Sequence, residues 1–467
     1  MKTTAPSGAI PVRARWWNRR VVLLIAFAFS VMADPVSSVS YAIEAALRAL
    51  DGRLDLLVAA MAPVVFVVAL VVASYHQLVA RFPEGGGSAA ATGSAFGVGW
   101  SFVPMGALIV DFVLTIAISV SAGSSAIISY VPAVARYRLW LALGLLILVA
   151  LLMQFGHLGR AVFAVLTIGF IVIGGTVLIQ ALGDPAGPAI AEPTLMKSAP
   201  LAVILAFPVA LALATGIEAP SSAIAQLPQL DDAGRRSFGR WALWLTLGIV
   251  GVLTVGLAVA AVHLQIGVPH ADTTLVAEIA RAGSSGTVFA AFQGATALLL
   301  LSAASSSFQA GPGLLKALAR SATPGESRHG VLPVAFGRMN KHHVPLVGVA
   351  IFFVLSAAVV IAGGARDQEL VLFYAVAVFV SFLMGLTAMV VFAYRERHFG
   401  WLVLNVAATI AVAFTLAVSV LRPAAIASLG ATAIVAAGLY IAWVRAGRPR
   451  GAEYALAEAE APDDETE

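Results

Sequence analysis

The chain contains no cysteine and few charged residues for its length. None of its 467 residues is cysteine, which excludes disulfide bonds and thiolate metal sites. Asp, Glu, Lys and Arg together make up 11% of the residues, whereas soluble domains carry about 25%. This shortage of charge, together with a hydrophobic fraction of 60%, predicts a membrane protein with little soluble mass.

The chain also lacks the patterns of a nucleic-acid-binding protein or an enzyme. The net charge is +4, but Lys and Arg lie between apolar segments and do not cluster on a soluble face. The glycine-rich stretch 83–97 has no preceding strand and no lysine, so it is not a phosphate loop; we interpret it as a connection packed tightly under the bundle. Without a nucleophile–base arrangement, no enzymatic activity, cofactor or nucleic-acid partner is expected.

Apolar runs long enough to cross a bilayer recur along the chain. A helix needs ~20 predominantly apolar residues to cross the hydrocarbon core. Twelve such runs predict an all-α membrane protein with about twelve transmembrane helices, for which the lipid bilayer is the expected partner. Their approximate bounds are 20–50, 56–80, 102–132, 139–154, 160–182, 199–227, 240–267, 286–315, 345–364, 368–393, 400–420 and 424–444.

The positions of Lys and Arg predict the orientation of these spans. Most of the 28 basic residues lie in connections that share one side with the N-terminus, and basic connections face the cytoplasm. We therefore expect a multi-pass protein of the plasma membrane with both termini in the cytoplasm. A basic tail, 1–19, would precede the first span, and the acidic segment 445–467 would follow the last as a disordered or frayed tail.

Two predicted spans contain a carboxylate, a proline and serines. The stretch "ADPVSSVSYAIE" begins at Ala33 in the first span, and "ATGIEAPSSAIAQLP" begins at Ala214 in the sixth. Paired broken helices at corresponding positions are typical of transporters built from inverted repeats. We therefore expect residues 20–182 and 199–393 to form two five-span repeats, with two further spans in 400–444.

Four carboxylates lie in the interior of the predicted spans: Asp34, Glu44, Asp111 and Glu218. An ionisable residue inside the membrane is costly and therefore marks a functional site. Glu44 has an equally good alternative, as a residue near a helix end that reaches the interface. The other three have apolar sequence on both sides.

The third span aligns three oxygen-bearing residues. Asp111, Thr115 and Ser119 follow one another at intervals of four residues, which places them on one helix face. Such oxygens suit a dehydrated monovalent cation or a substrate ammonium group. Each hydroxyl could instead bond a carbonyl of its own helix, but that alternative does not explain the carboxylate.

The two broken spans are expected to contribute to the same polar cavity. Asp34 lies beside the first break, and Thr215 and Glu218 lie beside the second. Two acids in a desolvated cavity cannot both ionise at low cost. We therefore expect Asp34 or Glu218 to carry a coupled proton, while the other acid and Asp111 contribute charge to the cation site.

These motifs resemble the amino acid–polyamine–organocation (APC) superfamily, and most closely its Kim-type potassium–proton symporters related to KUP. The resemblance covers residues 20–395 and implies a LeuT-type fold of five plus five spans, with ions between spans 1, 3, 6 and 10. It is carried by "DPVSSVSYAIE", "FPEGGGSAAATGSAFG", "LIVDFVLTIAISVSAG", "TGIEAPSSAI" and "SSSFQAGPGLLKALA".

The resemblance also implies a set of binding residues in spans 1, 3, 6 and 10. A monovalent cation would be held by Asp111, Thr115, Ser119 and Thr215. The full set of substrate- or ion-binding residues is Asp34, Tyr41, Asp111, Thr115, Ser119, Thr215, Glu218 and Tyr374. Phe112 departs from the pattern, because the potassium branch usually has tyrosine after the third-span aspartate.

The resulting interpretation is a secondary transporter that imports a small cation, potassium, together with protons. The alternative is a proton-coupled amino-acid permease of the same fold. Asp34 and Pro35 at the first break disfavour a substrate carboxylate there, because neither an anion nor a residue without an N–H would bind it. A non-transporting scaffold or sensor would not need three intramembrane carboxylates. A homodimer is one expected assembly.

Overall fold

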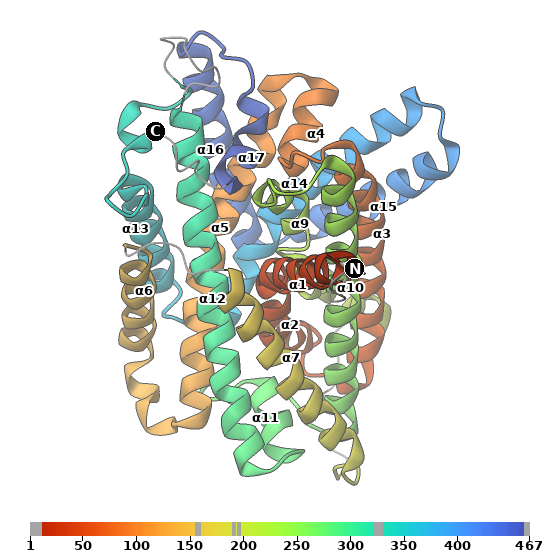
Figure 1. The fold of residues 1–467 in the computed structure, drawn as a ribbon. Coiled ribbons are helices and arrows are strands. Elements are labelled where there is room, and N and C mark those ends of the chain that lie inside the picture. The colour runs from red at the N-terminus through yellow and green to blue at the C-terminus, as the bar shows by residue number, and fades with distance from the viewer. Residues whose placement is uncertain (1–11, 155–159, 189–192, 194–197, 321–329, 462–467) are drawn as a thin grey trace, which may run out of the picture.

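The computed structural model describes residues 12–154, 160–188, 193, 198–320 and 330–461; the side chains of 12–19, 160, 374 and 375 lie outside this description. Within these ranges the regular structure is helical (Figure 1). The α-helices are α1 (Val12–Val31), α2 (Ala33–Ala49), α3 (Leu57–Arg81), α4 (Gly87–Phe96), α5 (Val98–Tyr130), α6 (Arg138–Gln154), α7 (Arg160–Gly183), α8 (Ala199–Ala210), α9 (Ala219–Ala223), α10 (Asp232–His263), α11 (Leu275–Ala282), α12 (Gly286–Ala319), α13 (Leu346–Ala362), α14 (Asp367–Arg395), α15 (Phe399–Ser419), α16 (Pro423–Arg445) and α17 (Ala455–Glu460).

The prediction of an all-α membrane protein is confirmed. Eleven helical segments of the described residues are long and apolar enough to cross a membrane, and α13, with 17 residues, is a shorter apolar helix at the position of the predicted ninth span. The bounds agree to within a few residues for most spans. The largest differences lie at α1 and α10, because α1 begins at Val12 and α10 at Asp232, whose N-cap Asp231 accepts a hydrogen bond from the Gly234 N–H.

The first span is broken as predicted, but at a different residue. The polar stretch that begins at Ala33 is itself helical and forms α2, and the break lies just before it, at Met32. Pro35 falls in the first turn of α2, where its missing N–H costs least. The carboxylate of Asp34 therefore lies at the start of a half-helix.

The sixth span is interrupted more completely. After α8 the chain tightens into a short 3-10 helix, η3 (Leu211–Ala214). It then becomes extended at Thr215 and left-handed at Gly216, where φ is +75°. A positive φ favours glycine, so Gly216 permits the turn that leads into α9. The gap between the two half-helices leaves Thr215 to Glu218 outside any helix.

The two short helices α4 and α17 lie together at one end of the bundle, and α11 lies at the other (Figure 1). Most of the glycine-rich α4 is buried, and it packs against α14 and α5, in agreement with a tightly packed connection. The expectation of a disordered or frayed acidic tail is wrong for 452–461. This segment forms the 3-10 helix η6 (Ala452–Tyr454) and α17, which contacts α12, α9 and α4.

Candidate functional site

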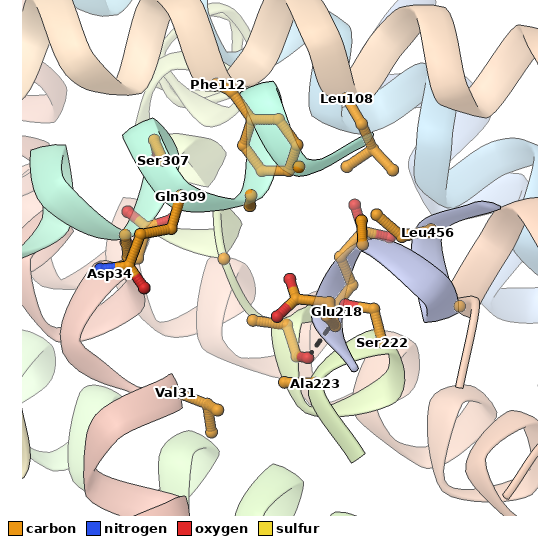
Figure 2. Close-up of a pocket in the computed structure, with 18 of the residues that line it drawn as sticks. Val31, Asp34, Leu108, Phe112, Glu218, Ser222, Ala223, Ser307, Gln309 and Leu456 are labelled. Atoms are coloured by element: carbon orange, nitrogen blue, oxygen red, sulfur yellow. Dashed lines mark hydrogen bonds between the residues drawn. The ribbon is translucent and has the colours of Figure 1, made fainter. Parts of the chain in front are cut away.

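A cavity of about 350 Å³ lies between the broken spans and the central helices α5 and α12 (Figure 2). Three predicted residues, Asp34, Asp111 and Glu218, line it. Each comes from a different element: the first turn of α2, the middle of α5, and the residue before α9. Ser307, Gln309 and Lys316 of α12 also line it, so the wall carries one basic side chain besides the carboxylates. The cavity therefore gathers carboxylates that lie far apart in the sequence.

The two breaks meet at the backbone of Gly216. A Cβ atom added there would lie 2.7 Å from Asp34 Oδ2 and equally close to Pro35 Cδ, so only glycine fits between the half-helices. A second link is the 2.9 Å hydrogen bond between the hydroxyls of Ser38 and Thr215. The polar side chains of α2 thus hold the interrupted sixth span against the first.

Glu218 is held by hydroxyl groups from two other spans. The Tyr75 hydroxyl donates to its Oε2 at 2.8 Å, and the Ser381 hydroxyl lies 3.1 Å from its Oε1. Ser88 of α4 contacts Ser381 at 2.8 Å. These partners can serve both states of the carboxyl group, because a hydroxyl can donate to a carboxylate or accept from a carboxylic acid.

Asp34 is half-buried and Asp111 is buried, and both have fewer hydrogen-bond partners than Glu218. Asp111 is only 5% exposed, and its Oδ1 atom has no hydrogen-bond partner among the described residues; the same holds for Asp34 Oδ1. Ser119 Oγ, two turns further along α5, likewise has no hydrogen-bond partner among the residues that the structure describes. Buried polar atoms are normally hydrogen-bonded, so orphaned carboxylate oxygens at a cavity indicate a place for a ligand.

Four other predicted residues, Tyr41, Thr115, Ser119 and Thr215, are buried but do not line this cavity. Thr115 and Ser119 lie on the same face of α5 as Asp111 but outside the cavity wall. The Thr215 hydroxyl is hydrogen-bonded to Ser38. The Tyr41 hydroxyl is also hydrogen-bonded to Ser38, at 2.8 Å, so Tyr41, Ser38 and Thr215 form one group of linked hydroxyls. Tyr374 lies in α14, and its side chain is outside the description.

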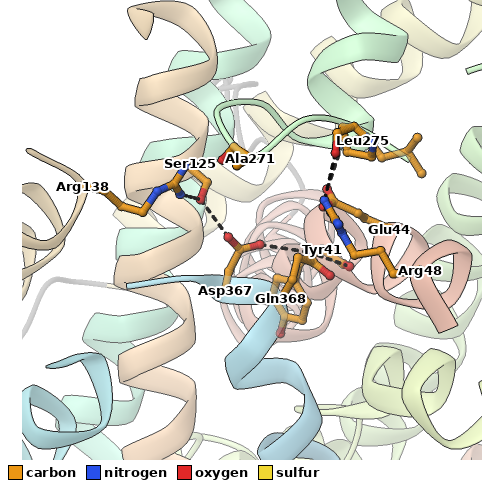
Figure 3. A network of polar contacts seen from close by, with 10 residues as sticks. Tyr41, Glu44, Arg48, Ser125, Arg138, Ala271, Leu275, Asp367 and Gln368 are labelled. Atoms are coloured by element: carbon orange, nitrogen blue, oxygen red, sulfur yellow. Dashed lines mark hydrogen bonds and ion pairs between the residues drawn. The ribbon is translucent and has the colours of Figure 1, made fainter. Parts of the chain in front are cut away.

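A second cluster of buried acids lies apart from the cavity (Figure 3). Glu44 accepts from Arg48 Nε at 2.8 Å and from the Leu275 N–H at 2.9 Å. Asp367 accepts from the Ser125 hydroxyl at 2.7 Å and from the Gln368 amide at 2.9 Å. Arg138 donates in turn to Ser125. Glu44, which is 2% exposed, is therefore part of a closed network and not of the cavity.

The sequence interpretation did not identify several of these groups. Tyr75, Ser88 and Ser381 hold Glu218, and Asp367 completes the second cluster. Single hydroxyls in apolar runs carry no periodic signal. Asp367 directly precedes the predicted tenth span and resembles an ordinary helix-end acid.

Among the described residues, no group of three His, Cys, Asp or Glu side chains has the geometry to hold a metal ion.

A bundle of membrane-length helices, two of them broken around a polar cavity, is the architecture of a secondary transporter. A family model described as amino acid permease matches residues 21–444, and the chain belongs to this APC family. It is a multi-pass protein of a family of membrane transporters.

Two further proteins are similar to this chain. The potassium transporter KimA of Bacillus subtilis is 28% identical over 347 residues, which cover 70% of this chain and 54% of that protein. The chain thus spans about half the length of this curated relative. A crystal structure of a manganese transporter from Eremococcus coleocola, in complex with an aromatic bis-isothiourea substituted compound, matches with a TM-score of 0.49 and 14% identity, covering 95% of this chain and 97% of that one.

Proposed function

We propose that the protein is a potassium–proton symporter that binds its substrates in the cavity between the broken spans. The observation that carries this proposal is the pair of buried, orphaned oxygens on Asp34 and Asp111 at the wall of that cavity. An unpaired carboxylate in a dry site is costly, and a bound monovalent cation would supply the missing partner. The similarity to a potassium transporter supports the choice of ion.

Glu218 is the better proposed proton carrier of the two candidate acids. Tyr75 and Ser381 satisfy both of its oxygens without any cation. Hydroxyl partners adapt to either protonation state, so the group can load and release a proton without losing its contacts. Asp34 and Asp111 would then provide the charge for the cation, with Thr115, Ser119, Thr215 and Tyr41 shaping the site behind them.

The proposed arrangement includes two inverted repeats, 20–182 and 199–393, followed by two spans in 400–444. The facing breaks at Met32 and Gly216 support this division. The concentration of Arg and Lys on one set of connections supports cytoplasmic termini in the plasma membrane.

A proton-coupled amino-acid permease is the second candidate, because the matching family model carries that description. A cavity of about 350 Å³ is large enough for a small organic cation. The acid at the first break favours an ammonium group over a carboxylate at this point.

The deciding experiment is transport by the purified protein in proteoliposomes. Rubidium-86 uptake and proton movement, followed with a trapped pH dye, should occur together, and unlabelled potassium should compete. Labelled lysine and alanine provide the parallel arm. Amino-acid uptake without rubidium uptake would replace the potassium proposal with the permease.

Ligand binding gives an independent measurement. Potassium should raise the melting temperature of the purified protein, because binding to the folded state stabilises it. Sodium at equal ionic strength and neutral amino acids serve as controls. Equal shifts with all three would contradict a specific cation site.

A further inference from the structure

The segment after the last span returns to the bundle and reaches the cavity. α16 ends at Arg445, and positive φ values at Gly447, Arg448 and Gly451 reverse the chain. The Trp443 indole donates to the Pro449 carbonyl at 2.9 Å and fixes this turn. The following residues, 452–461, which we call the tail segment, then run across the end of the bundle that carries α4 (Figure 1).

The tail segment forms part of the cavity wall itself. Leu456, Ala459, Glu460 and Ala461 line the same cavity as Glu218 (Figure 2). Leu456 is 3% exposed, and the Glu460 carboxylate accepts a hydrogen bond from Gln226, which follows α9 in the short helix η4 (Ile224–Gln226). The tail segment therefore bridges α12 and the second half of the broken sixth span.

Glycines on the receiving surface leave room for the tail segment. A Cβ atom on Gly93 of α4 would lie 2.6 Å from Glu453 Cβ, and one on Gly313 of α12 would lie 3.3 Å from the Ala459 carbonyl oxygen. Neither glycine has a positive φ, so backbone conformation does not require glycine at these positions. The close approach of the tail segment requires glycine at Gly93, whereas at Gly313 a small side chain fits after a shift of a few tenths of an ångström.

We propose that the tail segment is a reversible plug that closes the cavity on the side of α4 and α17. A helix of six residues is too short to be stable in isolation, so docking holds it in place and release can unfold it. Substrate could leave the cavity on this side only after the plug moves. The transport readout below rests on the proposed function, and the labelling readout does not.

A disulfide bond tests the plug directly. A Cβ atom on Gly313 would lie 3.6 Å from Ala459 Cβ, within the range of about 3.5–4.5 Å that a disulfide requires. The chain has no cysteine of its own, so Gly313→Cys/Ala459→Cys introduces a single defined pair. Oxidation should lower rubidium uptake at least tenfold relative to the same protein in reductant, and reductant should restore it.

The two single-cysteine variants control for oxidation itself and should show no such change. Mass spectrometry of intact protein establishes that the disulfide has formed. Equal uptake by the fully oxidised and reduced double variant would overturn the plug.

Accessibility of the cavity provides a readout that needs no knowledge of the substrate. Ala223, a buried residue of the wall, becomes a reporter for maleimide labelling as Ala223→Cys. Adding Gly93→Ala, which collides with Glu453, should raise the labelling rate at least tenfold. Adding Gly438→Ala, at a helical position with no atom within 4 Å of the added Cβ, should leave it unchanged.

The combined results separate the two proposals. If no variant takes up rubidium while Gly93→Ala still speeds labelling, the substrate is wrong and the plug stands. If Leu456→Asp and Gly93→Ala both label at the original rate, the plug is wrong whatever the substrate.

Discussion

The acids at the cavity and the cluster of Glu44 and Asp367 differ in how their carboxylate oxygens are satisfied. In the cluster of Glu44 and Asp367, all four carboxylate oxygens accept a hydrogen bond from a protein group. At the cavity, Asp34 and Asp111 each keep one oxygen without a partner among the described residues. Complete partnering is typical of a structural network, whereas orphaned oxygens are typical of a site that awaits a ligand. Burial alone does not distinguish these roles.

The largest expected effect on uptake comes from replacing one aspartate by asparagine, and the same replacement in each cluster tests the difference between them. Asp111→Asn should reduce uptake at least 100-fold, because it removes charge from the site, and should leave the melting temperature equal or higher, because an uncompensated buried carboxylate is costly. Asp367→Asn should retain uptake within about threefold. Tracer uptake normalised to folded protein measures both, and equal losses in the two variants would remove the distinction.

The second prediction concerns proton coupling at Glu218. Glu218→Gln removes a titratable group. The change in uptake rate across the working pH range should therefore be about tenfold smaller than in the unmodified protein. Tyr75→Phe is the matched control, since it deletes a hydrogen bond to Glu218 and keeps the carboxyl group; its uptake should still depend on pH. If Glu218→Gln keeps the original profile, Asp34→Asn becomes the variant to examine for the same change.

A smaller effect is expected along the α5 face. Thr115→Ala and Ser119→Ala should each raise the apparent KM for rubidium by only about two- to fivefold. The effect should be small because neither residue lines the cavity. Ser119→Ala should also leave the melting temperature unchanged, since its hydroxyl has no protein partner to lose in the described structure. A fall in kcat without a change in KM would argue against a role in binding.

The smallest effect on transport is expected in the fully partnered cluster. Glu44→Ala should leave uptake per folded molecule within about twofold and lower stability by about 1–3 kcal/mol, because buried donors lose their acceptor. Thermal unfolding in detergent measures the loss. Arg48→Ala should also lower stability, because it leaves the buried Glu44 carboxylate without its ion-pair partner.

Sequence patterns were sufficient for the spans and for the acids at the cavity. Apolar length predicts a membrane helix, and a carboxylate such as Asp111 stands out in an apolar run because hydrocarbon makes it costly. The partners of Glu218 were not predictable in this way: Tyr75 is 143 residues away in sequence and Ser381 is 163. Their hydroxyls acquire a role only when three spans meet.

The tail segment illustrates a different limit. Its alanines and glutamates have the composition of a solvated tail, and its docking depends on glycines in α4 and α12. A cleft made by the backbone of other segments leaves no trace in the sequence that fills it. The position of the first break, at Met32 and not within the polar stretch, was missed because a helix tolerates proline in its first turn.

The short helix α13 makes lipid thickness relevant to this protein. Its 17 residues span about 26 Å at 1.5 Å per residue, less than the ~30 Å hydrocarbon core. A helix this short is accommodated by local thinning of the bilayer or by flanking residues that reach the interface, at a cost of fractions of a kcal/mol per Å. α13 packs closely against α12. A Cβ atom on Gly311 would collide with Phe352, and one on Gly348 would collide with Pro312. We therefore expect a change in bilayer thickness at α13 to act on α12, which lines the cavity, and acyl-chain length becomes a variable to control in any reconstitution.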